Sequence, residues 1–294
     1  MSDYSMWVLE YGQTREAPKS AIVYGAHNQG SIRLPYCYTV IKGHGHIAMI
    51  DVGYNYYDHS KAFVNRFGPT DWHSPKQALS LIGLAPENID TIFLTHAHFD
   101  HMGNLDDFPN AHLYVQEEEV AKQVWAMSLP SRLQFVSTGT DPQDILKCVD
   151  LVRQGRITML DGDREDVFPG IDLKITPDTH SPGHMYVVVR NDGASQSQDK
   201  WVFAGDLVYS KFNLRSPGTL VGQEWIYAPV GLATGSNTKC VLAIEEMMKQ
   251  VDYDEKRLIA VHEADLAQQF PSRIVEDGLR IIEICLGDGE SSRI

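Results

Sequence analysis

Short apolar runs, separated by glycine-, proline- and aspartate-containing turns, recur along the chain. Runs of this length, rich in β-branched and aromatic residues, predict buried strands. They fall into two groups with helical segments between them. We expect strands at residues 6–9, 21–24, 36–41, 46–53, 91–95, 112–116, 157–160, 171–175, 185–190, 201–204 and 258–261.

Helix starts are marked by capping residues. Ser74–Pro75 predicts a helix, because serine caps the first turn and proline fits its first position. Asp141–Pro142 repeats this pattern, and further helices are expected from Glu117 and after Ser236. Cys148 follows the helical spacing of its neighbours, so we interpret it as a core residue and not a nucleophile.

Two segments interrupt this alternation. A helical insertion is expected at about residues 117–155, and its bulky apolar residues either pack or line a substrate pocket; packing is the favoured interpretation. A long loop is expected at about residues 210–236, and such loops are usually functional or mobile. Because no internal repeat, low-complexity tract or linker is found, residues 1–294 are predicted to form a single domain.

Composition narrows the classes of partner. A formal net charge of −14 argues against nucleic acid, whose binding depends on Lys and Arg neutralising phosphates. Cys37, Cys148, Cys240 and Cys285 have no C-x-x-C spacing and indicate free thiols in a reducing compartment. With neither a signal-peptide pattern nor a long apolar run, no membrane contact is expected, and the prediction is a cytoplasmic protein.

One stretch carries a dense set of metal-ligand residues. The apolar run at residues 91–95 is followed by His96, His98, Asp100 and His101. In extended backbone alternate side chains share a face, so His96 and His98 can bind one ion. Asp100 and His101 follow where the strand turns into a loop, so they can reach a second ion. Imidazole plus carboxylate suits zinc, manganese or iron.

The H-x-H-x-D-H pattern resembles the signature of the metallo-β-lactamase superfamily of metal-dependent hydrolases. Later segments resemble the rest of that family's site: Thr179–His184 suggests His180 as a ligand, Phe203–Asp206 suggests Asp206, and Ala260–Glu263 suggests His262. The resemblance implies an αββα sandwich of two mixed β-sheets flanked by helices. It also implies two divalent metal ions, zinc first, with manganese or iron as alternatives.

The resemblance assigns each ligand a place. One ion is held by His96, His98 and His180, the other by Asp100, His101 and His262, and Asp206 and a hydroxide bridge them. His184 competes with His180, although the family pattern favours His180. Asp51, at the end of a predicted strand, either supports the ligands or caps a turn.

Two further residues narrow the activity. Tyr209 follows Asp206 by three positions, and Phe99 lies inside the metal motif, as in acyl-homoserine lactonases; residues 51–56 resemble a pyridoxolactonase-like relative. The function implied is a quorum-quenching type of lactonase, which opens a small lactone by attack of the bridging hydroxide. In this mechanism the Tyr209 hydroxyl polarises the substrate carbonyl, and Asp100 passes a proton to the leaving group.

Other activities stay open. They are a thioesterase of glyoxalase II type, another ester or cyclic amide hydrolase and, less favoured, a mononuclear iron dioxygenase. The expected partner is a small-molecule substrate, and a homodimer is left open.

Overall fold

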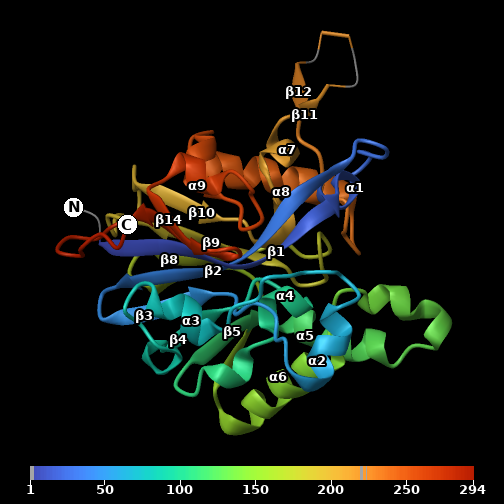
Figure 1. The fold of residues 1–294 in the computed structure, drawn as a ribbon, viewed down its shortest axis with the longest axis horizontal. Coiled ribbons are helices and arrows are strands. Elements are labelled where there is room, and N and C mark those ends of the chain that lie inside the picture. The colour runs from blue at the N-terminus through green and yellow to red at the C-terminus, as the bar shows by residue number, and fades with distance from the viewer. Residues whose placement is uncertain (1–2, 219–220, 223) are drawn as a thin grey trace.

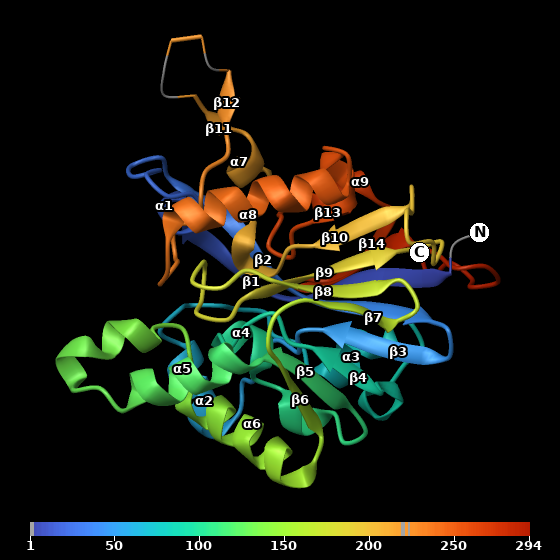
Figure 2. The ribbon, with the colours of Figure 1, turned by 180° about the vertical axis from the view of Figure 1, so that it is seen from behind.

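Two β-sheets lie face to face in the centre of the molecule, with helices on both outer surfaces (Figure 1, Figure 2). The computed structural model describes residues 3–218, 221–222 and 224–294. The expected αββα sandwich is therefore confirmed.

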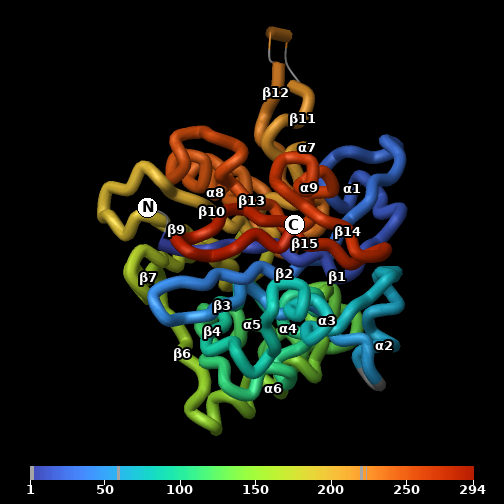
Figure 3. Tube along the Cα trace, turned by 60° about the vertical axis from the view of Figure 1, so that its left-hand side comes forward, coloured from blue at the N-terminus to red at the C-terminus, as the bar shows by residue number. Residues whose placement is uncertain are grey.

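The first sheet has eight strands within these ranges, and its order mixes antiparallel and parallel pairs. In spatial order they are β14 (Ser272–Glu276), β15 (Leu279–Cys285), β1 (Tyr4–Pro18), β2 (Ser31–Gly43), β3 (His46–Ile50), β4 (Thr91–Phe93), β5 (His112–Gln116) and β6 (Ile157–Leu160). The pair formed by β15 and β1 joins the two ends of the chain in one sheet (Figure 3).

The second sheet has five strands in the described residues: β13 (Leu258–Ile259), β10 (Lys200–Phe203), β9 (Met185–Arg190), β8 (Ile171–Ile175) and β7 (Arg164–Phe168). A small pair, β11 (Ser216–Pro217) and β12 (Trp225–Ile226), projects from the molecule (Figure 3).

Helices cover the outer faces of both sheets (Figure 1). The α-helices are α1 (Lys19–Ile22), α2 (Asp58–Val64), α3 (Pro75–Ser80), α4 (Phe99–Met102), α5 (Glu117–Met127), α6 (Pro142–Gln154), α7 (Lys211–Leu214), α8 (Asn237–Gln250) and α9 (Leu266–Gln269). Short 3-10 helices span Pro86–Asn88, Leu105–Asp107, Ser131–Ser137, Gly205–Leu207 and Glu255–Arg257. No helix in the described ranges is long and apolar enough to cross a membrane.

The strand β1 shows why the apolar runs are continuous. Successive side chains of a strand point to opposite faces. Met6 and Val8 pack into the core between the sheets, whereas Trp7 and Leu9 pack into the core beneath the helices. Both faces are buried, so alternation with polar residues is absent.

Several predicted boundaries were wrong. Residues 21–24 do not form a strand: α1 occupies Lys19–Ile22, and a four-residue apolar run cannot by itself distinguish helix from strand. The strand at 46–53 ends at Ile50, because Asp51 turns into the left-handed region with φ 60°. The strands β7 and β14 were not predicted, because they are largely exposed and each has only two adjacent apolar residues beside charged ones. The strand β15 was also missed, although its apolar residues could have predicted it.

The segment expected as a helical insertion contains α5, the 3-10 helix Ser131–Ser137 and α6. Packing was the favoured interpretation of its bulky residues, and for three of them this was wrong. Trp125, Leu133 and Phe135 are exposed, Phe135 by 75%, because the 3-10 helix and the end of α5 extend beyond the sheet (Figure 1). Cys148 is fully buried in the core, as predicted. The segment 210–236 contains α7, β11 and β12, and its residues 219, 220 and 223 lie outside the described residues.

Candidate metal centre

The motif histidines lie where β4 ends and α4 begins. The strand stops at Phe93, His96 and His98 follow, with an extended backbone at His98, and α4 starts at Phe99. The first turn of α4 therefore carries Asp100 and His101 away from the preceding pair, which gives the two groups different directions. This agrees with the predicted division of the motif between two ions.

The first cluster contains the predicted trio of histidines and one carboxylate. His98 Nδ1 lies 3.0 Å from His96 Nε2 and 2.9 Å from His180 Nε2. Asp206 Oδ2 lies 3.3 Å from His180 Nε2 and 3.6 Å from His96 Nε2. All four side chains are buried. The ring nitrogens converge on one point. A single proton cannot bond to all of them at once, whereas one cation at that point can.

The second cluster uses the other oxygen of the same aspartate. Asp206 Oδ1 lies 3.1 Å from His101 Nε2 and 3.2 Å from His262 Nε2. Asp100 Oδ2 lies 3.7 Å from each of these two nitrogens. The structure thus brings together all of the ligands expected from the sequence, with Asp206 shared by both clusters.

The buried polar atoms of these clusters fit divalent cations. Both carboxylate oxygens of Asp206 and the Nε2 atom of His101 are buried and have no hydrogen-bond partner among the described residues. Buried polar atoms without a partner lower the stability of the folded state unless an ion or a water molecule binds them. Imidazole and carboxylate donors in this number suit zinc and related metals.

Burial also sets the protonation of the first cluster. It lowers the pKa of His98 to about 4 and holds the pKa of His96 and His180 well below 6.5. Burial alone would raise the pKa of Asp206, but the neighbouring His101 and His262 rings hold it well below its usual value. Neutral imidazoles and an ionised carboxylate are the metal-binding forms.

Outer hydrogen bonds orient the ligands. Asp51 Oδ2 lies 2.7 Å from His101 Nδ1, and Asp51 also accepts hydrogen bonds from the backbone N–H and hydroxyl of Thr95. The ligand-supporting role of Asp51 is therefore favoured over the turn cap. His262 Nδ1 lies 2.7 Å from the carbonyl oxygen of Pro35, which leaves Nε2 free to face the cluster.

The competition between the two histidines of the 179–184 segment is decided by position. His180 points into the first cluster, whereas His184 lies outside it. The Nε2 atom of His184 accepts a hydrogen bond of 3.1 Å from the backbone N–H of Asp206, and its Nδ1 atom lies 3.3 Å from the Thr176 hydroxyl. His184 thus holds the backbone that carries Asp206.

A cavity of about 150 Å³ opens directly onto both clusters. Both residues expected to meet substrate line it. Phe135 of the insertion also lines it, as the less favoured interpretation of that segment allowed, together with side chains to which the sequence assigned no role in the site: Tyr36, Phe67 and Leu232. Phe99 stacks on Phe67 with ring centroids 4.5 Å apart, and Tyr209 lies 4.9 Å from the His262 ring. Apart from the candidate ligands, no ionisable group other than tyrosine is found among the described residues that line the cavity.

Burial, and then the Asp206 and Asp100 carboxylates, raise the pKa of the Tyr209 phenol well above 10. The phenol therefore keeps its proton at neutral pH. It can donate a hydrogen bond into the cavity beside the clusters.

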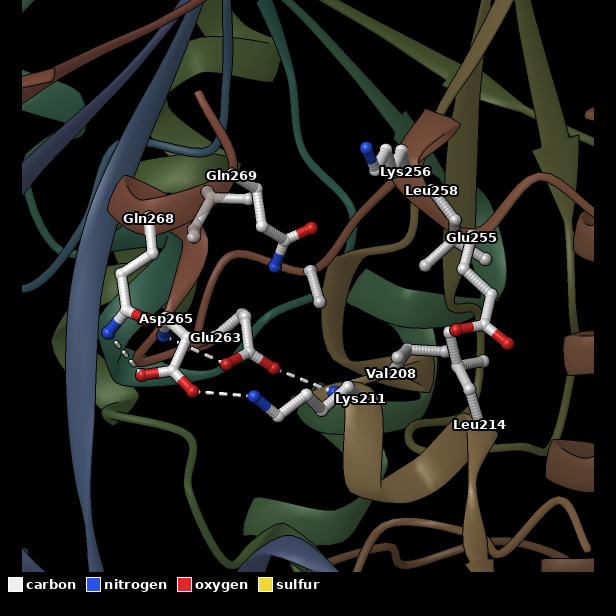
Figure 4. Close-up of a pocket in the computed structure, with 12 residues that line it drawn as sticks. Val208, Lys211, Leu214, Glu255, Lys256, Leu258, Glu263, Asp265, Gln268 and Gln269 are labelled. Atoms are coloured by element: carbon white, nitrogen blue, oxygen red, sulfur yellow. Dashed lines mark hydrogen bonds and ion pairs between the residues drawn. The ribbon is translucent and has the colours of Figure 1, made fainter. Parts of the chain in front are cut away.

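A larger cavity of about 430 Å³ lies between α7 and α9 (Figure 4). It contains none of the predicted site residues, and Lys211 and Asp265 form an ion pair at its edge. Glu263 in its wall accepts hydrogen bonds from the backbone N–H groups of Lys211 and Asp265. Glu263 thereby ties the segment after His262 to the start of α7.

Asn213 makes a second set of buried hydrogen bonds that was not predicted. The side-chain oxygen of Asn213 accepts hydrogen bonds from the backbone N–H groups of Tyr209 and Ser210. Its amide group donates to the carbonyl oxygens of Ile22 and Ala228. Two of its partners, Ile22 and Ala228, lie on distant segments, and the capping box that Asn213 forms with Ser210 at the start of α7 was not predicted.

Comparisons with known proteins bear on the family and the fold. The profile of the Metallo-beta-lactamase superfamily matches residues 34–254. The N-acyl homoserine lactonase AiiB of Agrobacterium fabrum is 25% identical over 160 residues, 53% of this chain and 53% of that protein. The chain therefore spans about half the length of this relative. The anti-Pycsar protein Apyc1 of Bacillus phage 010DV004 is 20% identical over 67% of this chain and 77% of its own length.

Solved structures match over almost the whole chain. A quorum-quenching N-acyl homoserine lactone lactonase superposes with a TM-score of 0.65 at 18% identity, covering 94% of this chain and 98% of its own. The dizinc quorum-quenching lactonase AidC gives 0.60 at 17% identity over 90% and 89%. The hydrolase AbOPH gives 0.64 at 20% identity over 98% and 96%. At these identities the likeness supports the fold alone.

Proposed function

The chain belongs to the metallo-β-lactamase superfamily, and we propose that it is a two-metal hydrolase that opens a small, uncharged lactone ring. The observation that carries this proposal is Asp206, whose two oxygens face two separate ligand clusters at one end of an apolar cavity. The names of the lactonase relatives found by sequence support the choice of lactone.

The two ligand sets support a place for each ion. His96, His98 and His180 would hold one ion, Asp100, His101 and His262 the other, and Asp206 would contact both. When bound, two such ions lower the pKa of water from about 15.7 toward about 7 and polarise a carbonyl group.

Tyr209 and Asp100 supply the chemistry of the chain itself. The Tyr209 phenol keeps its proton and can stabilise negative charge that develops on the carbonyl oxygen of the substrate. Asp100 lines the same cavity and can carry a proton to the alkoxide that leaves when the ring opens.

The walls of the cavity support the substrate class. Phe67, Phe99 and Leu232 offer apolar surface, and neither lysine nor arginine occurs among the described residues that line it. A polyanionic or phosphodiester substrate would meet no side-chain cation there, and the net charge of −14 repels it at long range. A small organic body that carries a neutral ester bond fits this surface better.

The test combines metal analysis with a substrate panel. We expect two ions per chain and release of acid from short-chain, long-chain or aromatic lactones, followed with a pH indicator. Far higher kcat/KM for thioesters or phosphodiesters than for every lactone would overturn the lactonase assignment but leave the two-metal site. A single iron with oxygen uptake would indicate a dioxygenase and overturn the whole proposal.

A further inference from the structure

Glu119 is a buried carboxylate that belongs neither to the ligand clusters nor to the cavity. It lies in the first turn of α5, where its neighbours Glu117 and Glu118 are exposed, yet Glu119 itself is 0% exposed. A charge in such a place is costly unless strong hydrogen bonds compensate it. Its partners therefore indicate why it is there.

The carboxylate joins two segments that are far apart in the sequence. Its Oε1 atom accepts a hydrogen bond of 2.9 Å from the backbone N–H of Ala97, the residue between His96 and His98. Its Oε2 atom accepts hydrogen bonds from the Ser181 hydroxyl at 2.8 Å and the Gly183 N–H at 2.6 Å. Every one of these donors lies one to three residues from a candidate ligand.

Tight packing fixes the distance between the start of α5 and the segment that carries Gly183. A Cβ atom added to Gly183 would lie 2.4 Å from the backbone nitrogen of Glu119, so only glycine fits at this contact. Gln123, one turn further along α5, is also buried. Glu119 can therefore shift little without moving both segments.

The contacts of Glu119 reach only one of the two clusters. The three histidines of the first cluster lie on the two segments that Glu119 joins. In the second cluster, His101 is held by Asp51, and His262 by the carbonyl of Pro35.

We propose that Glu119 is a positioning residue that sets the geometry of the three-histidine site and so its affinity for its ion. The inference rests on the proposed two-metal function. It adds that the Glu119 contacts serve the three-histidine site alone, so they can be weakened while Asp51, which bonds His101 and also the Thr95 hydroxyl beside His96, stays in place. Outer hydrogen bonds of this kind orient ligands, and their loss typically weakens metal binding by about 10–100-fold.

The test is graded removal of metal from the loaded protein. Wild type, Glu119→Gln and the matched control Glu118→Gln are each incubated with increasing chelator, desalted and analysed for metal. The glutamine amide cannot accept from all of the donors, so one ion should leave Glu119→Gln at about 10–100-fold lower chelator strength. The second ion should leave as in wild type, and Glu118→Gln should match wild type throughout. His180→Ala shows which release step belongs to the three-histidine site.

Ser181→Ala provides a milder version, because it removes a single donor and leaves the Glu119 carboxylate in place. It should weaken the same ion by a smaller factor, and it serves alone if Glu119→Gln does not fold. Release curves equal to wild type in the folded variants would overturn the inference. So would parallel loss of both ions, which would indicate a general structural role. If wild-type protein itself binds fewer than two ions, the proposed function fails instead.

Discussion

At the scale of single residues, Tyr209 is the sharpest test of the proposed chemistry. Its raised pKa keeps the phenol protonated, so Tyr209→Phe removes a hydrogen-bond donor without changing the shape of the cavity. We expect kcat for the lactone to fall by roughly 10- to 1,000-fold, as for the loss of an oxyanion donor. Metal content should stay at the wild-type value.

Tyr186→Phe is the matched control for this prediction. Tyr186 is also buried, but it packs in the core beneath α8, away from the clusters. Its variant should keep wild-type kcat. If Tyr209→Phe were as active as Tyr186→Phe, Tyr209 would be a packing residue.

At the scale of elements, α6 contains a buried acid that makes stability depend on pH. Burial, and then the Asp141 carboxylate, raise the pKa of Asp144 to about 7. The unfolded chain ionises this group near pH 3.9. The folded state therefore binds the proton more tightly, and its stability falls as pH rises from about 4 to about 7.

Asp144→Asn should remove this loss. The stability of the variant relative to wild type should grow by roughly 2 kcal/mol between pH 5.5 and pH 8, since about 1.5 pH units lie below the folded pKa. Urea unfolding of the metal-loaded proteins at both pH values measures it. Asp150→Asn, on the exposed face of the same helix, should show no such gain. A constant difference between wild type and Asp144→Asn would show that Asp144 is ionised in the folded protein.

At the scale of the whole molecule, the proposed ions connect the two layers of the sandwich. The motif residues 96–101 follow β4 of the first sheet. His180, Asp206 and His262 are carried by loops of the second sheet, after β8, β10 and β13. An ion bound between them acts as a cross-link that only the folded chain can form.

Removal of metal should therefore lower the thermal stability. An ion present at 100 times its Kd stabilises the folded state by about 2.7 kcal/mol, and each kcal/mol shifts Tm by about 2 °C in a chain of this length. We expect chelation to lower Tm by at least about 5 °C. The double variant His180→Ala and His262→Ala should not respond to chelator. An equal Tm with and without metal in wild type would contradict a cross-link between the sheets.

Local sequence determined much of the fold and of the candidate site. Most buried strands were predicted, because both faces of strands such as β1 are covered and their apolar runs are unbroken. His96 to His101 form a dense local motif, whereas His180, Asp206 and His262 were expected from the resemblance to the family, and the structure brings all of these side chains together. Exposed strands such as β7 and β14 were missed, because each has only two adjacent apolar residues beside charged ones.

Only the tertiary structure decided the contacts between distant segments. It placed His180 in the cluster and His184 behind Asp206, although both histidines occur in one short segment. It also showed Glu119, at the acidic start of a helix, as the buried partner of Ala97 and Gly183. The physical reason is that a motif shows only which ligands are close along the chain. Which side chains hydrogen bond to those ligands depends on the packing of the two sheets and their helices, which brings distant segments into contact.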